Sequence, residues 1–269
     1  MSEAAASVDD APVPLSVAIV CKNNETTIGR TLDSVRGLAT EIVAVDSGST
    51  DGTIALLEAA GAVVVRSDWL GYVRTKQKAV NHCTQAWVLV VDSDESADEA
   101  LRASIRAAVS RDDAGVAGYR VNRKVWYFGG YLEHAWQPEW RLRLVRRDRL
   151  KCAGVDPHDK LEIVGPGTAR VGSLSGTLRH DSFTTIGEHL SKQVGHARVG
   201  AMSRHAAGAR GSCVRLLFSP CLAMFRQLVL KSAWRDGWRG WLAAASTGVG
   251  TLMKHMILIE LSRGETRPR

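Results

Sequence analysis

The first hundred residues alternate short, β-branched apolar runs with segments whose apolar residues recur at helical spacing. Buried strands are expected at residues 15–21, 41–46, 62–66 and 87–92, and helices between them at 26–35, 52–60 and 73–83. Because this alternation is typical of parallel strands joined by covering helices, it predicts an open α/β fold. Ligands of such sheets bind outside the carboxyl ends of the strands, so that edge is where chemistry is expected.

The rest of the chain departs from this alternation. A further helix is expected at 98–110, strands at 117–121 and 142–146, an antiparallel extension with loops over 119–171, and helices over 185–206 and 216–261. We therefore expect a disordered leader of residues 1–14, an α/β domain of residues 15–200 with halves 15–96 and 97–200, and a helical tail of residues 201–269.

Composition excludes several classes of protein. With 45% hydrophobic and 23% charged residues, the 269-residue chain lies near the globular average, which argues against bulk disorder. Five cysteines without a C-x-x-C pair indicate neither a zinc ribbon nor a disulfide framework, and favour a reducing cytoplasm. Residues 1–14 lack the basic start and apolar core of a targeting signal. The longest uncharged apolar run, residues 240–253, is too short to cross a bilayer, so no spanning helix is expected.

The positive charge is concentrated near the C-terminus. Between Arg204 and Arg263 there are nine Lys and Arg residues and two acidic ones, so this segment carries +7, the net charge of the whole chain. An anionic partner is therefore expected for the tail. Three tryptophans spaced by four and three residues are expected on one helical face beside three cations, as in a helix lying in a membrane interface. The residues concerned are Lys231, Trp234, Arg235, Trp238, Arg239 and Trp241. The alternative is a helix that packs on the α/β domain and keeps its cations in solvent.

Two acidic segments follow predicted strands. Asp92 and Asp94 stand two residues apart at the end of the strand 87–92. Carboxylates so placed suit Mg²⁺ or Mn²⁺, which take oxygen ligands and share their coordination with substrate phosphates. The alternative is a solvated acidic turn. Asp46 ends the strand 41–46 and precedes a Ser- and Gly-rich turn, where its carboxylate can accept a hydrogen bond from a nucleobase, or simply close the turn.

Taken together, these segments resemble the nucleotide-binding half of family 2 inverting glycosyltransferases. The resemblance covers roughly residues 15–96 and rests on Cys21-Lys-Asn-Asn24-Glu25, Asp46-Ser-Gly-Ser-Thr-Asp-Gly-Thr53 and Asp92-Ser-Asp94-Glu95. Together with residues 154–161, these segments also resemble one branch of that family, the lipopolysaccharide-core β-glucosyltransferases. It implies a GT-A-like fold, a Rossmann-like and mostly parallel sheet with helices on both faces, here followed by the helical basic tail.

The resemblance also implies roles for particular residues. Asp46 would hold the uracil ring, Asp92 would lie near the ribose, and Asp94, with Asp92, would bind Mg²⁺ or Mn²⁺ on the diphosphate. Arg74 and Lys76, together with Lys78, would neutralise that diphosphate, or else form a solvated helix face. The full nucleotide-binding set is Asn24, Glu25, Asp46, Ser47, Gly48, Arg74, Lys76, Asp92 and Ser93.

The acceptor half should supply the base. An inverting transfer needs a group that takes the proton of the acceptor hydroxyl, and a carboxylate suffices. Asp159 aligns best with the acidic residue that follows histidine in the lipopolysaccharide branch, where glutamate is more usual; Asp156 is the second choice, and a structural His158-Asp159 turn is the alternative. His158, Trp136 and Trp140 are expected to bind the acceptor. His180-Asp181 is either a structural pair or a further metal or phosphate contact.

The resemblance therefore implies a metal-dependent enzyme that transfers a hexose, glucose in the narrower branch, from a UDP-sugar to a lipid-linked saccharide such as the heptose of the lipopolysaccharide inner core. Such an enzyme would be cytoplasmic and peripheral on the inner face of the inner membrane. The alternatives are a nucleotide-sugar-binding module without catalysis and a nucleic-acid-binding protein. The second is disfavoured because the N-terminal half has no basic stripe and no recognised binding motif.

Overall fold

The computed structural model describes residues 11–155, 158–167, 169–183 and 185–264. These residues form two compact units. Unit 1 comprises the described residues up to Arg123 together with Glu139–His180, and unit 2 comprises Lys124–Pro138 with the described residues from Asp181 onward. The chain thus passes between the units three times: within β6, between Pro138 and Glu139 just before β7, and within β10. The leader expected at 1–14 lies mostly outside the described residues.

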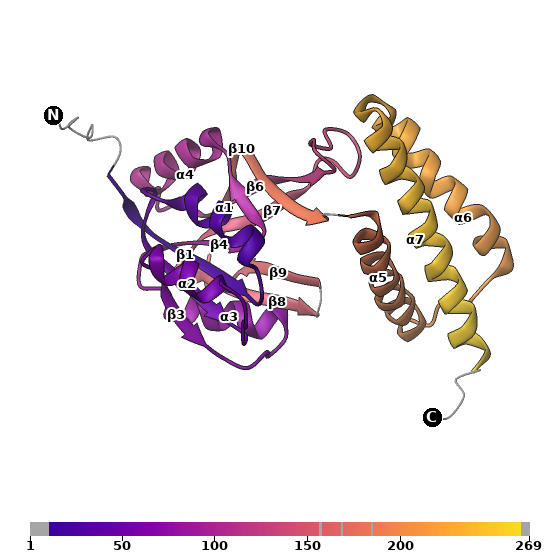
Figure 1. Ribbon diagram of the computed structural model, residues 1–269, viewed down its shortest axis with the longest axis horizontal. Helices are drawn as coiled ribbons and strands as arrows, with labels where there is room; N and C mark the ends of the chain where they lie inside the picture. Colours follow the sequence, from indigo (N-terminus) through magenta and orange to yellow (C-terminus); the bar gives the residue numbers. More distant parts are fainter. Residues whose placement is uncertain (1–10, 156–157, 168, 184, 265–269) are drawn as a thin grey trace. The chain divides into compact units, whose positions relative to one another are not determined.

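Unit 1 is built on a sheet with the strand order β3-β2-β1-β4-β7-β6-β10-β5 (Figure 1). β1, β2, β3 and β4 are parallel, whereas β7 runs antiparallel to β4 and to β6. A separate antiparallel hairpin is formed by β8 and β9. The strands are β1 Val13–Cys21, β2 Ala39–Asp46, β3 Val63–Arg66, β4 Trp87–Asp92, β5 Glu95–Ala97, β6 Val116–Tyr127, β7 Trp140–Arg146, β8 Leu150–Val155, β9 His158–Ile163 and β10 Arg170–Phe183.

Helices cover both faces of this sheet, because alternate strand residues point to opposite sides. On one face, α1 (Glu25–Val35), α2 (Thr53–Ala59) and α4 (Glu99–Arg111) pack on side chains such as Val17 and Ile19. On the other face, α3 (Tyr72–His82) and the β8–β9 hairpin pack on neighbours such as Ala18 and Val90. Both faces of the central strands are therefore buried, which explains their continuous apolar sequence.

The expected elements of the first hundred residues are present, with boundaries within about two residues. One expectation was wrong: the strand at 62–66 is not fully buried. β3 is the edge strand of the sheet, and its Val63 is exposed. The antiparallel extension expected after residue 119 is present as β6, β7 and β10, with the short β5 added as the opposite edge.

Unit 2 contains α5 (Ile186–Ala206), α6 (Cys213–Phe225) and α7 (Trp238–Arg263), with α7 packed on both of the others (Figure 1). α6 continues into a π-helical turn at Arg226–Leu230. Small residues on the buried side of α7 allow the close packing. At Gly248, for example, a Cβ would lie 3.3 Å from the carbonyl oxygen of Pro220.

The three tail tryptophans do not share one continuous helix, contrary to the expectation from their spacing. Trp234 lies in the short 3₁₀ helix Ala233–Asp236, while Trp238 and Trp241 lie in the first turn of α7. Gly237, with φ +63°, separates the two elements. All three indoles are nevertheless exposed.

Two helical segments are long and apolar enough to cross a membrane by length and composition: Cys213–Leu230 and Trp238–Arg263. The expectation of no spanning helix rested on the uncharged run 240–253, whereas these segments reach the length of a bilayer span because they also include cations. Length and composition alone do not decide whether either helix spans a bilayer, since buried helices of soluble proteins pass the same test.

Candidate functional site

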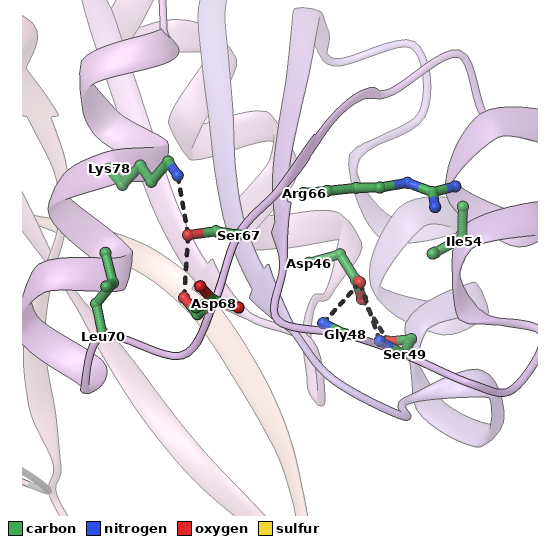
Figure 2. Close-up of a pocket in the computed structure, with 9 residues that line it drawn as sticks. All are labelled: Asp46, Gly48, Ser49, Ile54, Arg66, Ser67, Asp68, Leu70 and Lys78. Carbon is green, nitrogen blue, oxygen red and sulfur yellow. Dashed lines mark hydrogen bonds between the residues drawn. The ribbon is translucent and has the colours of Figure 1, made fainter.

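A cavity of about 650 Å³ opens in unit 1 at the carboxyl ends of β2 and β3. Figure 2 shows Leu70 and Lys78 on one side of it and Ile54 and Arg66 on the other, with Asp46 between them. Its lining residues are Asp46, Gly48, Ser49, Ile54, Arg66, Ser67, Asp68, Leu70 and Lys78. The strand-end position is the one that an open α/β sheet offers to ligands.

Asp46 is almost completely buried at this cavity. Its carboxylate accepts hydrogen bonds from the backbone N–H groups of Gly48 (2.9 Å) and Ser49 (3.0 Å), and from the Ser49 hydroxyl. Gly48 takes φ +90°, a conformation that favours glycine and allows this tight turn. The buried Ser47 hydroxyl beside it has no hydrogen-bond partner among the described residues. The turn thus holds a carboxylate that accepts several hydrogen bonds, and beside it an unused hydroxyl, at the end of β2.

Asn24 and Glu25, expected to bind the nucleotide, join two loops. The Glu25 carboxylate accepts from the N–H of Gly52 (3.1 Å), and the Asn24 N–H donates to the Thr53 hydroxyl (2.8 Å). The Asn24 side chain itself accepts from the N–H of Lys22 (2.8 Å). In this structure, both residues fix the loop after β1 to the loop after β2, and so shape the cavity from outside.

Lys76 is the centre of a buried ionic network. It lies on α3 with only 3% of its side chain exposed, and its Nζ is 2.6 Å from Asp92 Oδ1 and 2.7 Å from Asp159 Oδ2. Burial alone would lower the pKa of Lys76, but Asp92 and Asp159 outweigh it, so the pKa is raised. Lys76 therefore joins a carboxylate of the nucleotide half to one of the acceptor half. Arg74, by contrast, is exposed on the same helix.

Arg143 on β7 completes the network. Its guanidinium donates to Asp92 (3.0 Å) and to Glu95, which is fully buried. Glu95 also accepts from Arg123 (3.3 Å) and from the N–H of Asp92 (3.0 Å). Burial would raise the pKa of Asp92, but Arg143 and Lys76 together lower it below its usual range. Asp92 is thus ionised and held by two cations.

Asp94 is positioned differently from Asp92. Its carboxylate lies 3.4 Å from Nε2 of His180, and both side chains are partly exposed. The pairing of β10 with β5 sets His180 opposite Glu95, which explains this proximity. Ser93, between the two aspartates, is buried, and its carbonyl accepts from Thr31 (3.1 Å). The two aspartates therefore diverge, one into the ionic network and one toward His180.

This donor set fits a divalent ion only in part. Among the described residues, no group of three His, Cys, Asp or Glu side chains could hold a metal ion. Asp94 and His180 supply one carboxylate and one imidazole, while Asp92 is already engaged by Lys76 and Arg143. Such a pair suits Mg²⁺ or Mn²⁺ that shares its coordination with phosphate oxygens, rather than an all-protein cage.

Asp159 lies on β9 and reaches the network through Lys76. The side chain of His158 is not described, and Asp156 lies outside the described residues. Trp140 begins β7 and is exposed in unit 1, whereas Trp136 belongs to unit 2. The Trp136 indole N–H donates to the Thr247 hydroxyl (3.0 Å), and its ring packs edge-on against Tyr127 and His189. Trp136 is thus largely engaged in the packing of unit 2.

Sequence reasoning missed Arg66 and Glu95 as site residues and did not expect Arg143 to lie in a buried ionic network. A usable signal was present for Arg143, which stands between Leu142 and Leu144 in a short apolar strand. Lys76 offered a similar one, since Thr75, Ala79 and Val80 are buried around it. A cation at a buried position requires a carboxylate partner.

Comparison with known proteins places this geometry in a family. Residues 16–161, more than half of the chain, match the family model described as glycosyl transferase family 2. The chain belongs to glycosyl transferase family 2. It is therefore a glycosyltransferase, and unit 1 has a GT-A-like fold.

Relatives agree with this membership. The chain is 32% identical over 247 residues to the lipopolysaccharide core biosynthesis glycosyltransferase LpsC of Rhizobium meliloti, a match that covers 88% of each protein. It is 32% identical over 189 residues to an uncharacterised glycosyltransferase of Rickettsia typhi, covering 66% of this chain and 63% of the relative. Among solved structures, glucosyl-3-phosphoglycerate synthase of Mycobacterium tuberculosis, crystallised with Mn²⁺ and UDP, matches with a TM-score of 0.34 and 26% identity over 41% of this chain and 44% of that one.

Proposed function

We propose that this glycosyltransferase moves glucose, with inversion, from UDP-glucose to a hydroxyl of a lipid-linked saccharide, such as a heptose of the lipopolysaccharide inner core. The observation that supports the proposal is that unit 1 holds the Asp46 cavity at the end of β2 and, at and just after the end of β4, the Lys76-linked Asp92 and Asp159 and the Asp94–His180 pair. The relationship to LpsC supports the class of acceptor. The choice of glucose rests on the motifs that resemble the lipopolysaccharide-core glucosyltransferases.

The uridine would occupy the cavity beside Asp46. The buried Asp46 carboxylate can accept from the imide N–H of uracil while it retains its bonds to the turn, because each oxygen offers two lone pairs. Arg66 and Lys78 line the same cavity and supply positive charge toward phosphates. Asp92 would contact the ribose only at its partly exposed edge, since Lys76 and Arg143 hold its oxygens.

Asp94 and His180 would hold Mg²⁺ or Mn²⁺ against the donor diphosphate. We assign the metal to Asp94 with His180 rather than to Asp92, because both oxygens of Asp92 face cations. When bound there, the ion supplies charge that stabilises the departing diphosphate. Asp94 contributes the negative charge that retains the ion, and the β5–β10 pairing fixes His180 beside it.

Asp159 would act as the base. A carboxylate on the acceptor side can take the proton from the sugar hydroxyl as that oxygen attacks the anomeric carbon from the face opposite the diphosphate. Lys76 holds the Asp159 carboxylate in place with a 2.7 Å contact. Lys76 is therefore a positioning residue in this scheme, and Trp140 is an exposed indole of unit 1 that would stack on the acceptor sugar.

Attachment to the inner face of the cytoplasmic membrane would bring the enzyme to its lipid-linked acceptor. The exposed tryptophans at 234, 238 and 241 and the excess of cations support a peripheral location. Two of the cations also stabilise unit 2: Lys231 donates to the carbonyl of Gln137 (2.9 Å) and Arg239 to that of Phe128 (3.0 Å). Arg235 is exposed and completes the set.

Titration calorimetry with UDP and Mn²⁺ tests the donor site. Asp94→Ala and Asp94→Asn should both abolish the Mn²⁺-dependent part of UDP binding, since the amide keeps the shape but lacks the charge. The matched control is Asp33→Asn, an exposed carboxylate on α1 that pairs with Arg36 and should leave binding unchanged. Unchanged affinity in both Asp94 variants would refute the metal assignment. Release of UDP from UDP-glucose only when a heptose-containing acceptor is present would establish transfer.

A further inference from the structure

Helix α6 and its π-helical turn carry an apolar face that no described residue covers. Seven large side chains, all between 52% and 69% exposed, form this outer face of α6: Val214, Leu217, Phe218, Leu222, Phe225, Val229 and Leu230. Most of them recur at intervals of three or four residues and so project from one side of the helix. Val214, Phe218, Leu222 and Phe225 also line a shallow hollow of about 500 Å³.

The opposite side of α6 is already occupied by α7. Pro220 and Met224 lie against Gly248, and the N–H of Gly211, just before α6, donates to the Ser262 hydroxyl of α7 (2.7 Å). α6 is therefore held with a defined side outward. So many exposed aliphatic and aromatic side chains on one helix indicate a surface that is covered in the working protein.

The charge around this face indicates what covers it. Residues 189–235 contain eight Lys and Arg residues and not one Asp or Glu. Arg215 and Arg226 are exposed on α6 itself, and at about 100° per residue they fall on the same flank of the outer face. Cations along the border of an apolar helical face are typical of helices that lie in an anionic lipid interface.

We propose that the outer face of α6 inserts into the headgroup and acyl boundary of an anionic lipid leaflet, with the helix lying parallel to the membrane surface. This deepens the membrane attachment proposed above, because it assigns the apolar anchor to α6 and leaves the tryptophans a supporting role. We favour a helix parallel to the surface over a spanning one because Arg215, Arg226 and Gln227 would otherwise have to enter the hydrocarbon core, where charged and amide groups are costly. A second copy of the chain fits less well, because two such faces would bring their arginines together without carboxylates from residues 189–235.

Vesicle flotation of the full chain tests this proposal. The wild type should float with vesicles of phosphatidylcholine containing about 30% phosphatidylglycerol, and much less with phosphatidylcholine alone. The triple variant Phe218→Ser, Leu222→Ser and Phe225→Ser should bind the anionic vesicles about 100-fold more weakly, since three large side chains lose their burial in lipid. The matched control changes three exposed apolar residues of unit 1, Leu56→Ser, Val63→Ser and Val171→Ser, and should float like the wild type.

Two further measurements separate the possible outcomes. Mn²⁺-dependent UDP binding should be unchanged in the α6 triple variant, which excludes misfolding, and this binding can fail in the Asp94 variants without affecting flotation. Light scattering without lipid should show a monomer. The proposal is overturned if the triple variant floats like the wild type, if only Trp234→Ala, Trp238→Ala and Trp241→Ala together abolish flotation, or if flotation ignores phosphatidylglycerol. It is also overturned if the wild type ignores vesicles and forms a dimer that the triple variant disrupts, which would make the face an interface between copies.

Discussion

The carboxyl edge of the unit 1 sheet and the outer face of α6 depart from ordinary burial in opposite ways. At the sheet edge, buried Lys76 is linked through Asp92 to buried Arg143, which in turn pairs with buried Glu95. On α6, large apolar residues such as Phe218 face outward. A buried ionic network contributes little stability compared with apolar packing, and an exposed apolar face lowers solubility. Neither region is explained by folding alone, so each indicates contact with something other than this chain.

The largest expected effect tests whether the charges at the sheet edge have a role in catalysis or only in structure. Asp159→Asn should lower kcat by about 10²–10⁴, the usual contribution of a positioned base, while the affinity for UDP stays the same. Steady-state kinetics with UDP-glucose and a heptose-containing acceptor would measure this. The control is Glu162→Gln, an exposed carboxylate on the same strand. If Asp159→Asn retains most of its activity while Asp156→Asn loses it, the base is the other carboxylate.

Lys76 tests the structural side of the same network. Lys76→Met should lower the free energy of unfolding by about 3 kcal/mol, because it removes the cation shared by two partly buried carboxylates. Urea denaturation at pH 7 would measure the change. Lys160→Met, at an exposed pair with Glu162, should change stability by less than about 0.5 kcal/mol. Combining Lys76→Met with Asp159→Asn should recover part of the loss, and equal effects at Lys76 and Lys160 would contradict the network.

The ion pairs of Glu139, in the same unit, can be tested through the pH dependence of stability. Burial would raise the pKa of Glu139, but its bonds to Arg123 and Arg141 lower it to about 2. Since the folded pKa is below the unfolded value of about 4.3, this carboxylate stabilises the fold fully above pH 5 and loses its contribution as the pH falls toward 2. The loss should amount to about 1–3 kcal/mol. Glu139→Gln should therefore show a flatter stability profile from pH 5 to pH 3 in urea titrations, whereas parallel profiles would argue against the ion pairs.

The smallest effect concerns the charge beside the outer face of α6. Arg215→Gln should weaken binding to anionic vesicles about fivefold at low salt, equivalent to about 1 kcal/mol, and the difference should shrink as ionic strength rises. Flotation at 50 and 500 mM NaCl would show this. Arg111→Gln, an exposed arginine of unit 1, provides the control. A loss that persists undiminished at high salt would mean that Arg215 acts through packing rather than charge.

The sequence predicted best those elements whose structure depends on residues close together along the chain. The strand Trp87–Asp92 was placed with its observed boundaries, because an uninterrupted apolar run between polar loops has few other interpretations. The family resemblance added the GT-A-like fold. The ionic network could not be predicted in the same way, since Lys76 meets Asp159 across 83 residues of sequence. Where those partners meet depends on the β8–β9 hairpin, whose register is set by packing against α3.

In the tail, local spacing was misleading. The spacing of the tryptophans predicted one helical face, but Gly237 separates two helical elements there, and residue spacing alone does not reveal such a break. Helix was expected over 216–261, but the exposed apolar face of α6 was not, because arginines interrupt the apolar run although its apolar residues keep helical spacing. Whether such a face is buried by a neighbouring helix is decided only in the folded chain.

The carboxylate of Asp236 has a consequence for the order of events during synthesis. It accepts from the backbone N–H groups of Glu133 (3.1 Å), His134 (3.0 Å) and Ala135 (2.8 Å), about a hundred residues earlier in the chain. While the ribosome is still translating the residues between them, those three donors can bond to water but not to Asp236. The connection between β6 and β7 therefore reaches its final conformation only after nearly the whole polypeptide has been made. A chain cut short before residue 236 would leave this loop without its anchor, even though most of unit 1 had already been synthesised.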